Sequence, residues 1–156
     1  MTGVCIEPIG WVRGGRIEAV DDDWESVQAT IELDERRFGP ESLTGLDAFS
    51  HITVVFHFHA QAEQAVVAGA RHPRGRKDWP KVGIFAQRGK ARPNRIGVSV
   101  CRLRGVEGGR ISVQGLDAID GTPVLDVKPY MTGFAPRGEV LEPEWAVEIM
   151  REYWQR

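Results

Sequence analysis

The chain has 156 residues, of which 42% are hydrophobic and 27% are charged, and its formal net charge is −2. This length and composition indicate one soluble globular domain over residues 1–156. No apolar run reaches the ~18 residues of a membrane helix, and the first residues lack the pattern of a signal peptide. Cys5 and Cys101 have no paired spacing, which argues against a disulfide scaffold and predicts a cytoplasmic setting.

Short β-rich runs separated by turn residues dominate the chain. In chain order they cover residues 6–13, 26–33, 52–59, 82–86, 96–103, 110–116 and 124–130. Strands at this spacing, with few helical patterns, predict an all-β sandwich or barrel. A short helical turn is expected within 40–49. A C-terminal helix is expected over about 143–155, where Trp145, Ile149 and Tyr153 form an apolar stripe that would pack on the barrel.

Basic residues are concentrated in one part of the chain. Between Arg71 and Arg104 there are eleven Lys or Arg and one acid, Asp78, within 34 consecutive positions. Residues 69–81 are rich in Pro and Gly, which predicts a long surface loop, and long loops of compact domains are often functional. The basic block is either a solvated face or the contact surface for an anionic partner.

Two histidines alternate along a predicted strand, "ITVVFHFH". His57 and His59 share one strand face and could chelate a metal, or they could simply be hydrogen-bonded on a polar face. No neighbouring Asp, Glu or Cys supplies a third ligand at a standard spacing. No metal site is therefore predicted.

Polar residues crowd the start of a core strand in "RGKARPNRIGVSV". Arg88 follows a predicted strand, and an Arg held by a rigid element is a good clamp for a carboxylate or phosphate. Gly97 at a strand start is typical of a bulge or of the close approach of a ligand. A tight loop that reverses the chain is the competing interpretation. Asp117 follows another strand, while Asp126 and Lys128 share a strand face and could either pair or take part in chemistry.

The sequence contains no dinucleotide fingerprint, Walker loop or zincin pair. It resembles the TsaA/TrmO (YaeB-like) family, in the family's order, over residues 6 to about 131. The motifs that carry the resemblance are "EPIGWVR", "GLDAFSHI", "FHFH", "HPRG", "VGIFAQR", "RPNRIGVSV" and "GLDAIDGTPVLDVKPY". Two features depart from it: many members read "RPNP" where this chain has Arg95, and longer members continue beyond the barrel.

The resemblance implies a β-barrel methyltransferase that uses S-adenosylmethionine and forms a homodimer. It implies N6-methylation of the threonylcarbamoyl-adenosine beside the anticodon of tRNA. The positions that match the family's cofactor site are Trp24, His59, Ala60, Arg88, Ile96, Gly97, Val113, Gln114, Gly115 and Leu116.

Two further groups of residues follow from the expected reaction. The reaction needs acceptors that aim the adenine nitrogen at the methyl group and take its proton, and the candidates are Asn94, Asp117 and Tyr130. Lys128 is the candidate cation that orients the substrate. The predicted RNA contacts lie in the basic loop: Arg71, Arg74, Arg76 and Lys77. A non-catalytic RNA- or nucleotide-binding barrel and a metal hydrolase built on His57 and His59 are the competing hypotheses.

Overall fold

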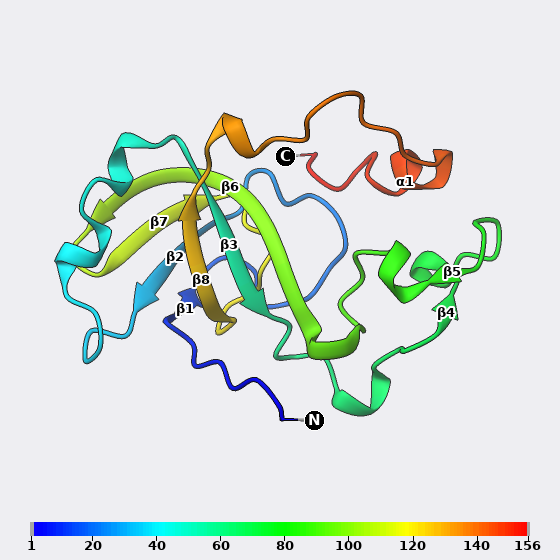
Figure 1. Ribbon diagram of the computed structural model, residues 1–156, viewed down its shortest axis with the longest axis horizontal. Coiled ribbons are helices and arrows are strands. Elements are labelled where there is room, and N and C mark those ends of the chain that lie inside the picture. The colour runs from blue at the N-terminus through cyan, green and yellow to red at the C-terminus, as the bar shows by residue number, and fades with distance from the viewer. Residues whose placement is uncertain (1, 156) are drawn as a thin grey trace.

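A computed structural model describes residues 2–155 and places six antiparallel strands in a closed barrel of order β1-β2-β7-β6-β3-β8 (Figure 1). The predicted all-β barrel is confirmed. Its strands are β1 (Gly10–Arg13), β2 (Gln28–Leu33), β3 (His51–His57), β6 (Ile96–Glu107), β7 (Arg110–Gln114) and β8 (Pro123–Pro129).

The alternation of side chains along β3 fills the barrel. Ile52, Val54 and Phe56 point inward and are at most 2% exposed, while the residues between them are half-buried on the outside. Phe56 lies opposite Gly97 in the ladder between β3 and β6. Burying each such side chain contributes ~1.5–3 kcal/mol, so this face determines the register of the strand.

The connections of an antiparallel barrel alternate between its two ends. One end therefore carries the β1–β2 connection (residues 14–27, the first loop), the long β3–β6 connection (58–95) and the β7–β8 connection (115–122). The other end carries the β2–β3 connection, with the 3₁₀ turns η1 (Pro40–Leu43) and η2 (Leu46–Ala48). These turns confirm the helical turn expected within 40–49.

The long connection contains an ordered arm, residues 69–91, which we call the basic arm. It holds a two-stranded sheet, β4 (Ala70–Arg71) and β5 (Val82–Gly83), and the 3₁₀ turns η4 (Pro73–Gly75) and η5 (Ile84–Ala86). Trp79 and Ile84 are buried within it. The prediction that 69–81 is irregular surface loop was wrong in part, and so was the barrel strand expected over 82–86.

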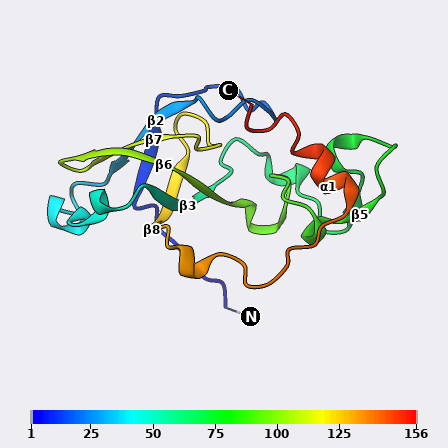
Figure 2. The same ribbon diagram turned by 90° about the horizontal axis from the view of Figure 1, so that it is seen from above.

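The C-terminal region crosses back toward the loops of the first end. After the 3₁₀ turn η7 (Thr132–Phe134), helix α1 (Glu144–Ile149) lies beside the basic arm in both views (Figures 1 and 2). The indole N–H of Trp79 donates a hydrogen bond to Glu148. The helix is thus shorter than the predicted 143–155, and it packs on the arm instead of the barrel. Within residues 2–155, no helix has the length and apolar character to cross a bilayer.

Candidate functional site

Segment 114–121 forms the floor of the candidate site, at the end of the barrel where the three long connections meet. The Gly115 N–H donates to the Val27 carbonyl (2.9 Å), and Gln114 Nε2 donates to the Glu25 carbonyl (3.1 Å). At its far end, the Cβ position of Gly121 would lie 3.7 Å from His59 Nε2. The floor therefore joins the first loop to the end of β3.

The predicted cofactor residues on this floor present mainly backbone. Val113 and Leu116 are each 1% exposed and belong to the barrel core. Gly115 takes a left-handed φ of +79°, which reverses the chain at the end of β7. A ligand on the floor would meet main-chain groups and the Gln114 amide, the kind of surface that can bind an adenine edge.

Asp117 carries a buried carboxylate oxygen on the floor that lacks a hydrogen-bond donor among the described residues. Its Oδ2 accepts a hydrogen bond from the hydroxyl of Tyr153, while its Oδ1 is buried without a hydrogen-bond partner among the described residues. Burial, reinforced by Asp117, raises the pKa of the Cys101 thiol to about 12. A buried oxygen without a donor is costly, and such exceptions often mark functional groups.

Two arginines from the basic arm lie near this carboxylate. Arg88 donates from Nη2 to the Val98 carbonyl (2.8 Å), which fixes its guanidinium against β6. Burial raises the pKa of the Tyr153 hydroxyl well above its usual range, Asp117 acts in the same direction, and the charges of Arg88 and Arg74 oppose the shift. The structure thus brings Arg88 and Asp117, both predicted site residues, into one electrostatic neighbourhood.

Trp24 of the first loop is buried, with 3% of its surface exposed. The Arg16 guanidinium lies over the Trp24 ring, 4.6 Å from the centroid. The backbone N–H of Trp24 donates to the Tyr153 carbonyl (2.9 Å). Trp24 therefore lies beside the floor, with its ring covered by Arg16, and its predicted role at the cofactor stays a prediction.

Gly97 is required by the barrel itself. A Cβ at this position would lie 2.5 Å from the Phe56 ring and 2.9 Å from the Phe58 ring. Packing against the two rings alone accounts for a glycine here, and the predicted approach of a ligand stays a prediction. Its neighbour Ile96 begins β6 opposite His57, and His59 and Ala60 follow in the exposed connection.

The four candidate catalytic residues come from three segments. Asn94 belongs to the 3₁₀ turn η6 (Pro93–Arg95), beside the start of β6, and Asp117 lies on the floor. Lys128 and Tyr130 lie at the C-terminal end of β8, where the Tyr130 N–H donates to the His51 carbonyl (2.9 Å). His51 pairs with Arg102, which pairs with Gln114 of the floor, so the grouping of these residues stays a prediction. Lys128 forms an ion pair with Asp126 (2.8 Å), which was one of its two predicted roles.

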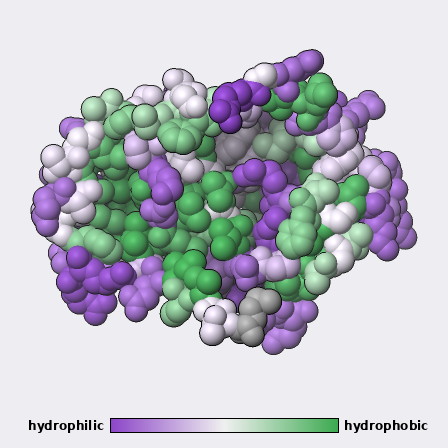
Figure 3. Space-filling view, viewed as in Figure 1, coloured by the Kyte–Doolittle hydropathy of each residue, from purple (hydrophilic) through white to green (hydrophobic). Residues whose placement is uncertain are grey.

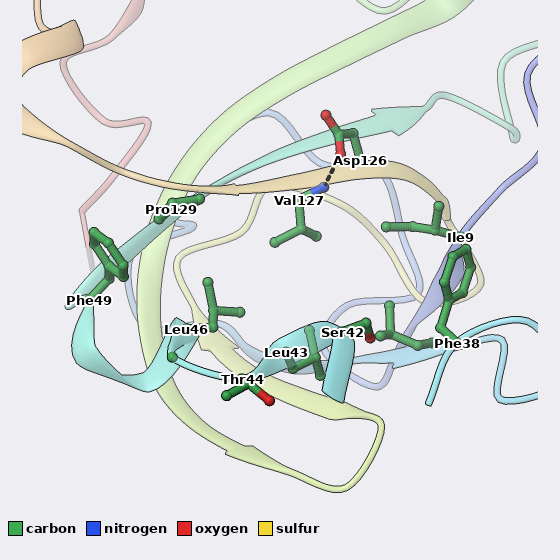
Figure 4. A pocket seen from close by; sticks show the side chains of 12 residues that line it. Ile9, Phe38, Ser42, Leu43, Thr44, Leu46, Phe49, Asp126, Val127 and Pro129 are labelled. Atoms are coloured by element: carbon green, nitrogen blue, oxygen red, sulfur yellow. Dashed lines mark hydrogen bonds between the residues drawn. The ribbon is translucent and has the colours of Figure 1, made fainter. Parts of the chain in front are cut away.

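A larger apolar cavity, of about 610 Å³, opens at the other end of the barrel (Figure 4). Leu43, Leu46, Phe49 and Val127 line it, and its one carboxylate, Asp126, accepts a hydrogen bond from the Val127 N–H (2.9 Å). It contains none of the predicted cofactor residues. A smaller cavity of about 190 Å³ borders the floor, lined in part by Gln114, Gly115, Cys101 and Trp154.

The predicted metal alternative finds no ligand set. Among residues 2–155, no three His, Cys, Asp or Glu side chains lie close enough to hold a metal ion. Burial, with Arg95 and His59 nearby, lowers the pKa of His57.

Two of the four predicted RNA contacts form ion pairs within the chain. Arg74 Nη2 pairs with Asp22 (2.9 Å), and Arg76 pairs with Asp78. Arg71 is half-buried, and its Nε has no hydrogen-bond partner among the described residues. Lys77 is exposed and has no ion pair among the described residues. Part of the positive charge of these four residues is therefore already neutralised.

Tyr153 and Trp154 were missed as site residues because they were assigned to the apolar stripe of a helix. The stripe ends with α1 at Ile149, so Tyr153 lies in the turns that follow. A tyrosine in a stripe expected to be buried needs a hydrogen-bond partner for its hydroxyl, and this need could have indicated a polar contact of Tyr153.

The fold and site define a small closed β-barrel whose ligand floor is built from loops at one end. Residues 21–135 match the tRNA-methyltransferase O N-terminal domain. The human tRNA (adenine(37)-N6)-methyltransferase is 41% identical over 118 residues, which are 74% of this chain and 26% of the human protein. The Pseudomonas aeruginosa protein RcsF, provisionally named an S-adenosylmethionine-dependent methyltransferase, is 39% identical over 81% of this chain and 56% of its own length.

The solved structures agree with the sequence relatives. The crystal structure of TrmO from P. aeruginosa superposes with a TM-score of 0.74 and 32% identity, covering 93% of this chain and 62% of that one. This chain belongs to the tRNA-methyltransferase O family, as its motifs predicted. It spans less than two thirds of the length of each of these three proteins.

Proposed function

We propose that this protein transfers a methyl group from S-adenosylmethionine to N6 of the adenine at position 37 of tRNA, with threonylcarbamoyl-adenosine as the substrate nucleotide. The names of its relatives support the reaction class. The observation that carries the proposal is the buried, unpartnered Asp117 Oδ1 on the floor between Gln114 and Gly121. This acceptor directly follows Val113–Leu116, the segment that was matched to the family's cofactor site.

The residues at the floor fit the chemistry of S-adenosylmethionine. The cofactor carries ammonium and hydroxyl donors, and Asp117 Oδ1 lacks a donor. It also carries a carboxylate, and Arg88 is exposed with only its Nη2 engaged by a protein carbonyl. We propose that Gln114 and the main chain of Gly115 and Leu116 hold the adenine.

The bound cofactor supplies an electrophilic methyl group on a sulfonium. The lone pair of an adenine N6 is delocalised, so the protein contributes chiefly by holding that nitrogen in line with the methyl group. Because the free oxygen of Asp117 is assigned to the cofactor, Asn94 and Tyr130 are the proposed acceptors that orient the amino group and take up its proton. Lys128 is the proposed cation that orients the substrate.

We propose a homodimer whose interface covers the outer face of β6. Val98 and Val100 are 45% and 42% exposed there, and apolar side chains gather over this side of the barrel (Figure 3). Exposed apolar patches commonly mark interaction surfaces. Because Arg88 binds the Val98 carbonyl, a partner on this face would adjoin the floor.

We retain the cytoplasm as the proposed location, supported by two free cysteines.

A ligand screen tests the proposal. A rise of the melting temperature with S-adenosylmethionine supports the methyltransferase, because a ligand that binds only the folded state stabilises it. A rise with RNA alone would instead support the non-catalytic barrel, and a rise with zinc alone the metal hydrolase. Calorimetry that detects no heat with S-adenosylmethionine on a folded sample would overturn the proposal.

A further inference from the structure

The last residues of the chain cover the floor of the site. We call residues 150–155 the C-terminal strap. The Asp23 N–H donates to the Glu152 carbonyl (3.1 Å), and the Trp24 N–H donates to the Tyr153 carbonyl (2.9 Å). The rings of Tyr153 and Trp154 meet edge to face, with centroids 4.9 Å apart. The strap is therefore held against the first loop by main-chain hydrogen bonds, and its aromatic side chains face the floor.

The strap contacts the floor through one hydrogen bond to a side chain. The Tyr153 hydroxyl donates to Asp117 Oδ2, and Asp117 Oδ1 stays buried without a partner among the described residues. A carboxylate with one oxygen held and the other free is restricted in rotation. It offers one acceptor in a fixed direction, which is what a positioned ligand donor requires.

We infer that Tyr153 is a positioning residue that holds Asp117 in a fixed orientation, so that its free oxygen accepts a hydrogen bond from an ammonium or hydroxyl group of the cofactor. This inference rests on the proposed function. It assigns a role to the strap, which lies outside the matched residues 21–135.

Titratable and charged groups from several elements surround the Tyr153–Asp117 pair. They are Cys101 of β6, Arg74 and Arg88 of the basic arm, and Glu25 of the first loop. Glu25 is paired with Arg102 (3.1 Å). The raised pKa values of Tyr153 and Cys101 keep both groups protonated and neutral at neutral pH. The proton of Tyr153 is thus retained as the donor to Asp117.

The test is the dissociation constant of S-adenosylmethionine, measured by calorimetry. Tyr153→Phe keeps the ring and removes the hydroxyl that holds Asp117 Oδ2, so the carboxylate loses its fixed orientation. We expect the variant to bind about tenfold more weakly than the wild type.

A double-mutant cycle isolates the hydrogen bond. Asp117→Asn replaces the oriented carboxylate, so adding Tyr153→Phe to it should not change the affinity further. Glu152→Gln, a neighbouring exposed position, is the matched control and should behave as wild type. Thermal unfolding confirms that each variant is folded.

Three results would overturn the inference. Tyr153→Phe could bind S-adenosylmethionine as the wild type does, or it could have the same effect in the Asp117→Asn background, which would make the contact merely structural. Tighter binding by Tyr153→Phe would show that the strap competes with the cofactor. If the folded wild type binds no S-adenosylmethionine, the proposed function fails together with this inference, whereas the other results leave it standing.

Discussion

Arg74 of the basic arm and Asp22 of the first loop form a two-pronged ion pair, with Nη2 2.9 Å from Oδ1 and Nη1 3.2 Å from Oδ2. Their side chains are only 25% and 27% exposed. The acidic and basic blocks that stand apart in the sequence thus meet in the fold. Part of the charge that suggested an RNA surface instead joins two of the connections that surround the site.

Arg74→Ala should lower the free energy of unfolding by about 1 kcal/mol, because it removes a partly buried, bidentate pair and leaves Asp22 without its partner. Urea denaturation measures this change. Lys77→Ala lies three residues further along the chain, at an exposed position with no ion pair among the described residues, and should leave the midpoint unchanged. Equal effects of the two substitutions would show that the pair contributes nothing to stability.

RNA binding should depend on the basic residues that lack carboxylate partners. Lys77, Lys81 and Lys90 are exposed and have no ion pair among residues 2–155. Replacing all three by Ala should weaken tRNA binding and flatten its logarithmic salt dependence by roughly 0.7 to 0.9 per lost phosphate contact. Filter binding across a salt series checks this. An unchanged slope would mean that tRNA contacts another surface.

Gly97→Ala should destabilise the fold by at least about 2 kcal/mol, since the new methyl group would meet the Phe56 ring at 2.5 Å inside the barrel. Gly105→Ala is the matched control in the same strand, because nothing lies within 4 Å of its Cβ position. Chemical denaturation compares them. A Gly97→Ala protein as stable as the wild type, but unable to bind S-adenosylmethionine, would restore the original interpretation of a ligand approach.

Cys101 should resist alkylation while Cys5 reacts. Cys5 is exposed, whereas burial and Asp117 raise the pKa of the Cys101 thiol to about 12. Iodoacetamide at about pH 8 should add one label, at Cys5, and a second only after denaturation. Because the folded pKa exceeds the ordinary 9.0, this thiol should also lower stability progressively as the pH rises from about 9 to 12. Rapid labelling of native Cys101 would contradict the burial.

The sequence predicted best where a pattern is local and repeated. Inward residues alternate with outward ones along β3, so Ile52, Val54 and Phe56 follow directly from a period of two. The motifs identified the family over the barrel. The strand expected at 82–86 failed because only Val82 and Gly83 find a partner strand, and Ile84–Ala86 close a 3₁₀ turn instead.

The site was harder to predict because its contacts join distant parts of the chain. Tyr153 and Asp117 are 36 residues apart, and no local pattern links them. Arg95, which stands where many family members have proline, also differs from them in backbone conformation. Arg95 has a φ of +50°, whereas proline is fixed near −65°, so the "RPNP" form could not adopt this backbone.

Methyl transfer to tRNA tests the central claim most directly. The purified protein would be incubated with methyl-labelled S-adenosylmethionine and with tRNA that carries threonylcarbamoyl-adenosine, and the nucleosides would be separated by mass spectrometry. The account predicts one labelled methyl group on the adenine at position 37, and a strong loss of that label with Asp117→Asn. A folded protein that binds both ligands but leaves every nucleoside unlabelled would contradict it.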